Sequence, residues 1–303
     1  MLREIRNINS YGASVLILSL FTFFVVSCAQ KPTKIYQSYD VNTNVLQTKL
    51  AKPIRVTDST VIIDARAPFE YAMSHLPQAV NLQWSDFADT RGPYKGRLKS
   101  DLTDSLRRLS LLGISPQSEV VILGSGLKGR GEEGRLAWTL LYLGVENIQI
   151  AEGDSLGLRY SNIVPPPRVN AKSWEPKLRL SILADKKEVK KIATSPQDGR
   201  THILDVRSKN EYFSKTRKLE YEYPDLRATH IEWTEFYTPD GRPNLSIREQ
   251  LSAVHIRPTD RIVVISNNGV RSGAVSYALL ALGYKNTANY PGGYAELLDL
   301  KAN

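Results

Sequence analysis

The stretch that decides the fold reads IVVISNNGVRS and occupies residues 262–272. Its first four residues are apolar and predict a buried strand. A loop of small and polar residues follows, in which Gly269 allows the positive φ that a tight turn requires. Apolar residues then recur at helical spacing over 274–282, which predicts a helix that ends near Gly283. The sequence therefore indicates a strand, a loop and a helix in direct succession.

The chain contains this arrangement twice. Residues 61–66 read VIIDAR and residues 202–207 read HILDVR, and a Glu-Tyr pair follows at the same spacing in both places, at 70–71 and 211–212. Four further matches keep the same order along the chain: 84–87 with 233–236, 113–116 with 255–258, 121–123 with 263–265, and 142–144 with 281–283. Internal repetition of this kind indicates two copies of one domain.

Each copy alternates short apolar runs with longer amphipathic stretches. Residues 61–63 and 120–123 predict buried strands, and residues 136–143 predict a helix that ends near Gly144. Alternation of strands and helices is typical of a parallel sheet with helices on both faces. We therefore expect an α/β fold in each copy, with ligands bound beyond the carboxyl ends of the strands.

Local composition divides the chain into five parts. Residues 1–28 combine a basic start, an apolar run and small residues at the end, as secretory signal peptides do. Residues 29–53 are polar and without periodicity, and they predict a tether. Two domains are expected at 54–163 and 183–303, joined by an extended linker at 164–182, where prolines are concentrated.

Cys28 is the only cysteine of the chain. With the preceding residues 25–27 it resembles the bacterial lipobox, whose cysteine is acylated and becomes the first residue of the mature protein. That resemblance implies a lipid anchor and an extracytoplasmic location, and Ala29 resembles the outer-membrane sorting pattern of Gram-negative lipoproteins. A plain cleaved signal, or an anchoring helix with an incidental cysteine, is the alternative. Because no other cysteine is present, disulfides and thiol chemistry within the two domains are excluded.

Composition restricts the class of partner. The chain has 42% apolar and 23% charged residues, which excludes a disordered chain and a multi-span membrane protein. Its formal net charge of +9 favours anionic partners. No block of lysine and arginine with interleaved aromatic residues is present, so nucleic acid is not expected. A membrane surface or a small oxyanion is the expected partner.

The repeated motifs resemble those of rhodanese domains. They are Asp64-x-Arg66 followed by Glu70, then the run His75-Leu76-Pro77-Gln78-Ala79, then the strand, loop and helix. Two copies in tandem resemble the thiosulfate and mercaptopyruvate sulfurtransferases, over about residues 50–300. In that family a cysteine in a C-x-x-G-x-R loop of the second copy takes sulfur from the donor, forms a persulfide and passes the sulfur to a thiophile. The resemblance implies no cofactor and no metal.

Ser266 stands where the family has this cysteine, whereas Gly269 and Arg271 match the family's loop. We expect an anion-binding loop that consists of Ser266, Asn267, Asn268, Gly269, Val270, Arg271 and Ser272. Its backbone amides would converge on a sulfonate, sulfate or phosphate group, and Arg271 would hold the oxyanion. A hydroxyl is hardly ionised near neutral pH and cannot form a sulfur–sulfur bond, so sulfur transfer is expected to be lost.

Several functions remain open at this point. The first is a membrane-anchored, catalytically degenerate protein that binds a small sulfur oxyanion, a phosphate-like anion or an envelope protein through the second loop. The alternative is a thiosulfate or mercaptopyruvate sulfurtransferase, as resemblance alone implies. A phosphate-ester hydrolase is a third class, but phosphatases with related loops also use cysteine. His230, His255 and Asp260 provide the residue types of a triad with Ser266, but their spacing gives no support for one.

Asp205, Arg207 and Glu211 are expected around the pocket as structural residues. The first two end a buried strand, where polar groups need partners, and Arg207 and Glu211 have the spacing of a helical salt bridge. The glycine-rich loop of the first copy, at 124–135, lacks the correctly placed lysine of a phosphate-binding loop and is predicted to be structural or regulatory. Arg227, in an insertion of the second copy, adds charge at the pocket rim or lies in solvent.

Overall fold

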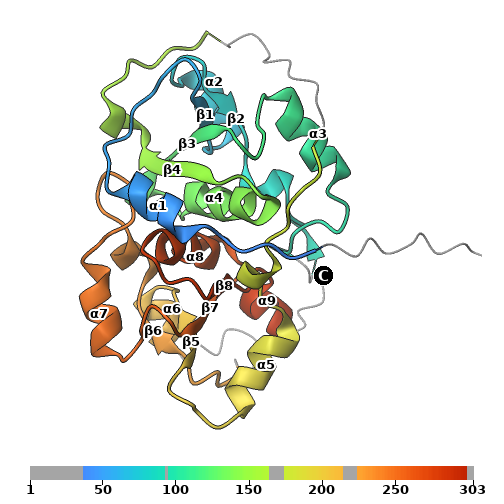
Figure 1. Cartoon of the computed structure of the whole chain (residues 1–303), viewed down its shortest axis with the longest axis vertical. Coiled ribbons are helices and arrows are strands. Elements are labelled where there is room, and N and C mark those ends of the chain that lie inside the picture. The colour runs from blue at the N-terminus through green and yellow to red at the C-terminus, as the bar shows by residue number, and fades with distance from the viewer. Residues whose placement is uncertain (1–36, 93–94, 164–173, 214–223, 299–303) are drawn as a thin grey trace, which may run out of the picture. The chain divides into compact units, whose positions relative to one another are not determined.

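The computed structural model describes residues 37–92, 95–163, 174–213 and 224–298 (Figure 1). In this part of the chain the strands form two sheets of four parallel strands each, with the orders β2-β1-β3-β4 and β6-β5-β7-β8. The strands are β1 Val61–Asp64, β2 Val80–Asn81, β3 Glu119–Gly124, β4 Asn147–Glu152, β5 Thr201–Asp205, β6 Thr229–His230, β7 Arg261–Ile265 and β8 Thr287–Asn289. Each sheet belongs to one copy of the repeat.

Helices alternate with the strands in both copies. The α-helices are α1 Thr43–Leu50, α2 Pro68–Met73, α3 Thr103–Leu111, α4 Glu132–Leu143, α5 Lys186–Thr194, α6 Lys209–Phe213, α7 Ile247–Ala253, α8 Val270–Ala281 and α9 Gly293–Leu297. The predicted α/β fold, a parallel sheet flanked by helices in each copy, is confirmed. The predicted helices that end near Gly144 and Gly283 are α4 and α8.

Each sheet is buried on both faces. In β1, Val61 and Ile63 pack into one apolar cluster and Ile62 packs into another, because successive side chains of a strand point to opposite faces. The central strand β7 is buried from Ile262 to Ile265 in the same way. Continuous apolar runs are the sequence mark of such parallel strands, which is why the short runs predicted these strands correctly.

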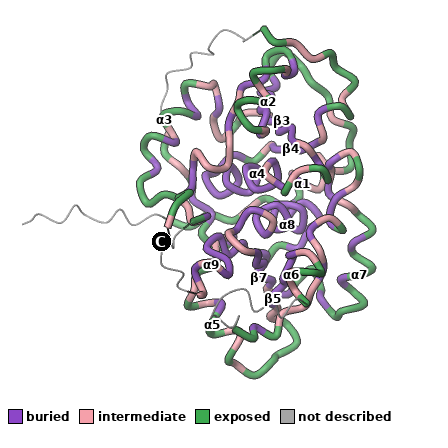
Figure 2. The backbone as a smooth tube through the Cα atoms, turned by 180° about the vertical axis from the view of Figure 1, so that it is seen from behind, coloured by how far each residue is buried: buried purple, intermediate pink, exposed green. Residues whose placement is uncertain are grey.

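Two long helices, one from each copy, pack against each other. Both α4 and α8 are buried along almost their whole length (Figure 2). The approach is close because the contact is made by small residues: a Cβ at Gly134 would lie 2.8 Å from the Cβ of Ala274. Side chains of both helices and of both sheets belong to one apolar cluster. The second copy is therefore packed directly on the first.

The predicted tether at 29–53 is wrong over its second half. Residues 43–50 form α1, which packs against β4 and α8, and Leu46 is only 2% exposed. Helix α1 has few apolar residues, but it is held against the domain because Leu46 packs into the core. Residues 29–36 and the predicted signal peptide at 1–28 lie outside the described residues. None of the helices in the described ranges is long and apolar enough to cross a membrane.

The predicted linker at 164–182 is also only partly described. Residues 164–173 lie outside the described ranges. From Trp174 onward the chain is docked rather than extended into solvent: the Trp174 indole donates to the carbonyl of Ile114 at 2.9 Å, and Leu178 is 2% exposed. The described part of the connection between the copies, from Trp174 onward, therefore packs on the domains.

Candidate anion-binding loop

In the loop of residues 266–272, residues 266–269 connect β7 to α8 and residues 270–272 form the first turn of α8. The loop follows the carboxyl end of β7, where ligands bind in parallel sheets. Gly269 directly precedes α8 with a φ of 77°, as the sequence analysis expected. No side chain fits in place of its hydrogen, because a Cβ there would overlap the carbonyl oxygen of Pro291. The glycine is required by both the backbone conformation and the space.

The protein itself does not use most backbone amides of this loop. Within the described residues, the N–H groups of 267–271 have no acceptor, whereas the N–H of Ser272 donates to Ser266 Oγ at 3.3 Å. Two of the unused amides, at 270 and 271, belong to the first turn of α8, where the helix carries partial positive charge. Unused donors at such a helix end favour a bound anion. The geometry agrees with an anion-binding loop, and the bound anion stays a prediction.

The hydroxyl of Ser266 is tied into the protein. Ser272 Oγ donates to Asn289 Oδ1 at 2.7 Å, so its oxygen accepts the proton of Ser266 Oγ, 3.1 Å away. Ser266 Oγ in turn accepts from the Ser272 amide. Ser266 is 1% exposed. The Ser266 side chain is thus bonded to Ser272 of α8, which in turn bonds Asn289 of β8, and its proton points to another hydroxyl rather than to a base.

The described residues form no triad with Ser266. The His230 ring lies 2.8 Å from the carbonyl oxygen of Arg207 and stacks on Tyr212, whereas His255 is exposed. Asp260 contacts a different histidine, His202, at 3.3 Å. These residues are spread over separate places, as their spacing in the sequence indicated.

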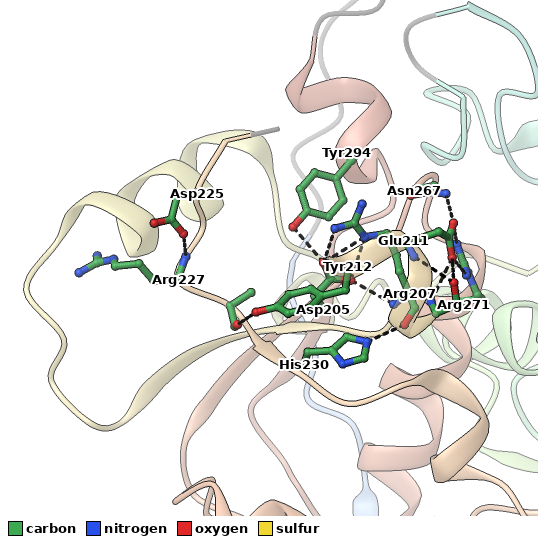
Figure 3. A network of polar contacts seen from close by, with 12 residues as sticks. Asp205, Arg207, Glu211, Tyr212, Asp225, Arg227, His230, Asn267, Arg271 and Tyr294 are labelled. Atoms are coloured by element: carbon green, nitrogen blue, oxygen red, sulfur yellow. Dashed lines mark hydrogen bonds and ion pairs between the residues drawn. The ribbon is translucent and has the colours of Figure 1, made fainter. Parts of the chain in front are cut away.

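Arg271 is occupied by an internal carboxylate. Its two terminal nitrogens donate to the two oxygens of Glu211, at 2.5 and 2.9 Å (Figure 3). Glu211 also accepts from the side-chain amide of Asn267 at 2.7 Å and from the hydroxyl of Ser208 at 2.8 Å. The Arg271 guanidinium, helped by Ser208, holds the pKa of the Glu211 carboxyl well below its usual range. The guanidinium fork that we expected to hold an oxyanion therefore fixes the loop to α6.

The predicted helical salt bridge between Arg207 and Glu211 is wrong. Arg207 pairs with Asp205 at 2.8 Å, and its guanidinium lies over the ring of Tyr294. Asp205 is fully buried and needs a partner close by, which the residue two positions later supplies. The first copy repeats the pair, with Arg66 and Asp64 at 2.6 Å. The structural role predicted for Asp205 and Arg207 agrees with this geometry.

A residue of the first copy completes the loop of the second. Arg135 on α4 is fully buried and donates to the carbonyl of Gly269 at 2.6 Å and to that of Gly96 at 2.7 Å. Burial lowers the pKa of Arg135 to about 9. No carboxylate pairs with it within the described ranges. In a trans peptide the N–H points opposite to the C=O, so Arg135 aims the N–H of Val270 away from itself.

Sequence reasoning missed Arg135. Arg135 ends the glycine-rich loop at 124–135 and directly precedes the apolar helical run at 136–143. A charge beside such a run can make a buried polar contact, because an unpaired charge is costly to bury. Its partner at Gly269 could not be inferred, since it lies 134 positions away in the other copy.

The corresponding loop of the first copy has its own acid. Gly124 takes the place that Ser266 has in the second copy, and a Cβ at Gly124 would overlap the carboxylate of Glu133. Glu133 is 3% exposed and its Oε2 has no hydrogen-bond partner. Burial raises the pKa of this carboxyl to about 7, against the opposing effect of the backbone amides of Glu133 and Gly126. The acidic side chain occupies the space that a nucleophile would need.

Arg227 lies apart from the loop. Figure 3 shows it near α5, on the opposite side from Arg271, and its guanidinium donates to the carbonyls of Ile192 and Ser195 at 3.0 and 2.6 Å. It does not add charge at the rim of the loop. In the described part of the chain no group of three or more histidine, cysteine or acidic side chains is placed to hold a metal ion.

Comparison with known proteins places this geometry in a family. A family model described as rhodanese-like domain matches residues 46–157 and 186–299. The thiosulfate sulfurtransferase YnjE of Escherichia coli (strain K12) is 25% identical over 254 residues, which cover 76% of this chain and 55% of that protein. The chain thus spans about half the length of this curated relative.

Solved structures show the same fold. The crystal structure of YnjE superposes with a TM-score of 0.65 at 20% identity, covering 87% of this chain and 65% of that one. The anaerobic ergothioneine biosynthesis enzyme from Chlorobium limicola, in complex with trimethyl histidine, superposes with a TM-score of 0.65 at 19% identity, covering 84% and 67%. At these identities the likeness concerns the fold.

Proposed function

Because this chain belongs to the rhodanese-like domain family and carries two copies of the domain, we propose that it has lost sulfur transfer and binds a small oxyanion through residues 266–272. The observation that carries the proposal is the hydrogen-bonded Ser266 hydroxyl, which donates to Ser272. A persulfide intermediate needs a thiolate, and the sequence has no cysteine besides Cys28.

Three features support anion binding. The amides of 267–271 have no acceptor in the described residues, and the N-terminus of α8 adds its partial positive charge. Arg135 brings a full charge close to Gly269 without a carboxylate partner in that same part of the chain. The charge of Arg271 is neutralised by Glu211, so it contributes little to the net field. Sulfate, thiosulfate and phosphate are the anions of suitable size and chemistry.

The alternative is a thiosulfate sulfurtransferase, the activity in the name of the relative from Escherichia coli. The two proposals are separated by thiocyanate production from thiosulfate and cyanide, measured for the full-length chain and for Ser266→Cys. We expect no production above the protein-free rate for the unmodified chain and at least about a tenfold gain for Ser266→Cys, because the cradle then surrounds a thiol.

Two results would contradict the proposal. Turnover by the unmodified chain at the rate of a true sulfurtransferase would overturn the loss of function. An inactive but folded Ser266→Cys protein that also fails to bind sulfate by calorimetry would overturn anion binding and leave an envelope protein as the proposed partner of the loop.

We further propose that the chain is held on the outer side of a bacterial membrane by acylated Cys28. Each buried methylene contributes about 0.8 kcal/mol, so multiple acyl chains give a stable anchor. Mass spectrometry of membrane-extracted protein should find an N-terminal peptide that begins at Cys28 and carries acyl chains. The Cys28→Ala protein should either be absent from the membrane fraction or retain its uncleaved signal peptide. The Ser27→Ala protein should behave as the unmodified chain does. An unmodified Cys28 in the mature protein would contradict the anchor.

A further inference from the structure

A cavity of about 530 Å³ lies in the second copy, away from the loop of residues 266–272. Its wall includes residues of α5, the start of β5 and the segment around Arg227. Thr201 begins β5 and lines the cavity, whereas Asp205 ends β5 beside the loop. Four residue steps along a strand span about 13 Å. The cavity extends along the sheet to Ile203 and to Thr229, which pairs with Leu204, but none of residues 266–272 lines it. Its occupant therefore does not depend on the proposed function.

The cavity has the size and the apolar floor of a small-molecule site. Ligand sites have volumes of about 300–1,000 Å³, and this one lies within that range. Ile192, Ile203, Leu226 and Val254 line it. Ile203 and Leu226 belong to the buried cluster on the α5 side of the sheet. A ligand that fills the cavity must bring an apolar body to cover this floor.

The acidic side chains of the wall already have partners. Glu188 pairs with Arg261 at 2.9 Å. Asp198 accepts from the backbone amides of Arg200 and Thr201, at 2.8 and 2.9 Å, and from the hydroxyl of Thr201 at 3.0 Å. These contacts close the turn before β5. Arg261 neutralises Glu188, whereas Asp198 keeps its negative charge and is held only by hydrogen bonds of the turn.

Two cationic side chains of the wall have no ion-pair partner in the described part of the chain either, and together they outnumber the single charge of Asp198. Neither Lys191 nor Arg227 has a carboxylate partner within the described residues. Arg227 is held in place by the carbonyls of Ile192 and Ser195, which fix the guanidinium without neutralising its charge (Figure 3). Its backbone has a φ of 49°, a conformation that costs a non-glycine residue free energy and persists where surrounding contacts impose it.

A histidine completes the polar part of the wall. His202 lines the cavity, and its Nε2 lies 3.3 Å from the carboxylate of Asp260, which is 2% exposed. Asp260 also accepts from the backbone amide of Arg257 at 2.8 Å. The buried carboxylate therefore fixes the orientation of the His202 ring. The wall thus combines two cations, one hydrogen-bonded carboxylate and an oriented imidazole around an apolar floor, and its net charge is positive.

We propose that this cavity binds a small organic anion, in which a carboxylate or sulfonate group is attached to a compact apolar body such as an aromatic ring. The anionic group lies toward Lys191 and Arg227, and the apolar body covers Ile203 and Leu226. The ligand class follows from the wall: an inorganic anion leaves the floor uncovered, and a neutral ring leaves the two cations unpaired.

The test uses the full-length chain with benzoate as probe and benzamide as its neutral counterpart of the same shape. We expect benzoate to bind and to shift the amide resonances of Ile192, Ile203 and Val254. One solvent-screened charge contact is worth about 0.5–1 kcal/mol, so benzamide should bind about two- to fivefold more weakly. Equal affinity of the two probes, or shifts confined to residues 266–272, would overturn the proposal.

Two lysines of the same helix provide a matched pair of variants. Lys191→Gln removes a charge from the cavity wall, and Lys187→Gln removes one from an exposed position that does not line the cavity. Both are surface changes that leave the fold intact. We expect a two- to fivefold loss of benzoate affinity, about the value of one screened charge, for Lys191→Gln only. Equal losses in both variants would show a nonspecific charge effect, and no loss in either would remove Lys191 from the site.

Discussion

At the scale of single residues, two arginines contact the loop of residues 266–272 or belong to it, and only one of them is neutralised by a carboxylate within the described residues. Arg271 and Glu211 form a neutral pair, 2.5 Å apart at the closest atoms. Among the residues that the structure describes, Arg135 hydrogen-bonds to carbonyls and lies over the ring of Trp138, and it has no carboxylate partner. The net positive charge close to Gly269 therefore comes from the first copy, although the second copy carries the matching motif.

The Glu211 carboxylate opposes an anion bound at the neighbouring amides, and Glu211→Gln tests this. The substitution removes the negative charge and leaves a side chain of the same shape. One partly screened charge is worth about 1 kcal/mol, so we expect sulfate to bind about fivefold more tightly. Calorimetry at fixed ionic strength measures the change.

The duplication supplies the control for this prediction. Glu70 has the equivalent position in the first copy, where its carboxylate accepts from the amide of Ala67 at 3.2 Å. Glu70→Gln should leave sulfate affinity unchanged. Weaker sulfate binding by Glu211→Gln would mean that the pair with Arg271 orders the amides, and that this order outweighs the repulsion.

At the scale of elements, the sequence predicted what local pattern determines. The apolar runs at 61–63 and 263–265 became β1 and β7, because strands buried on both faces need no other signal. Helix α1 was missed, because its eight residues have too few apolar side chains to show a period. Its stability comes from packing against β4 and α8, and such long-range contacts cannot be inferred from the local sequence pattern.

In the candidate site, too, locally determined features were predicted correctly and long-range contacts were not. Gly269 was assigned correctly, since a positive φ before a helix selects glycine whatever lies around it. The partner of Glu211 was assigned wrongly, because helical spacing pointed to Arg207 while the ion pair forms with Arg271, 60 positions away. Local spacing predicts a salt bridge only where no better-placed charge arrives from elsewhere in the fold.

At the scale of the whole molecule, the two copies differ in what fills their loops and depend on each other. The loop of the second copy is held by Arg135 of the first. The loop of the first copy holds Glu133, whose neighbour Gly134 lies against the second: a Cβ there would lie 2.7 Å from the hydroxyl of Tyr237. An ionisable group with a strongly raised pKa thus lies beside the contact between the copies.

This position of Glu133 predicts how stability depends on pH. Burial raises the pKa of its carboxyl from 4.5 to about 7 in the folded chain, and Glu132 and Tyr237 are the titratable groups that interact with it. The folded state then holds this proton more tightly than the unfolded state does. Its contribution to the free energy of unfolding is therefore lost progressively as the pH rises from about 4.5 to about 7, by about 3 kcal/mol in total.

Urea unfolding at pH 5 and pH 8 measures this loss, and Glu133→Gln is the variant that isolates it. Glutamine keeps the shape of the protonated acid and cannot ionise, so the variant should lack this part of the pH dependence and be the more stable protein at pH 8. Glu132→Gln, at the neighbouring position, should retain most of the dependence. If Glu133→Gln and the unmodified chain lose stability equally between the two pH values, another group causes the loss and Glu133 is ionised in the folded chain.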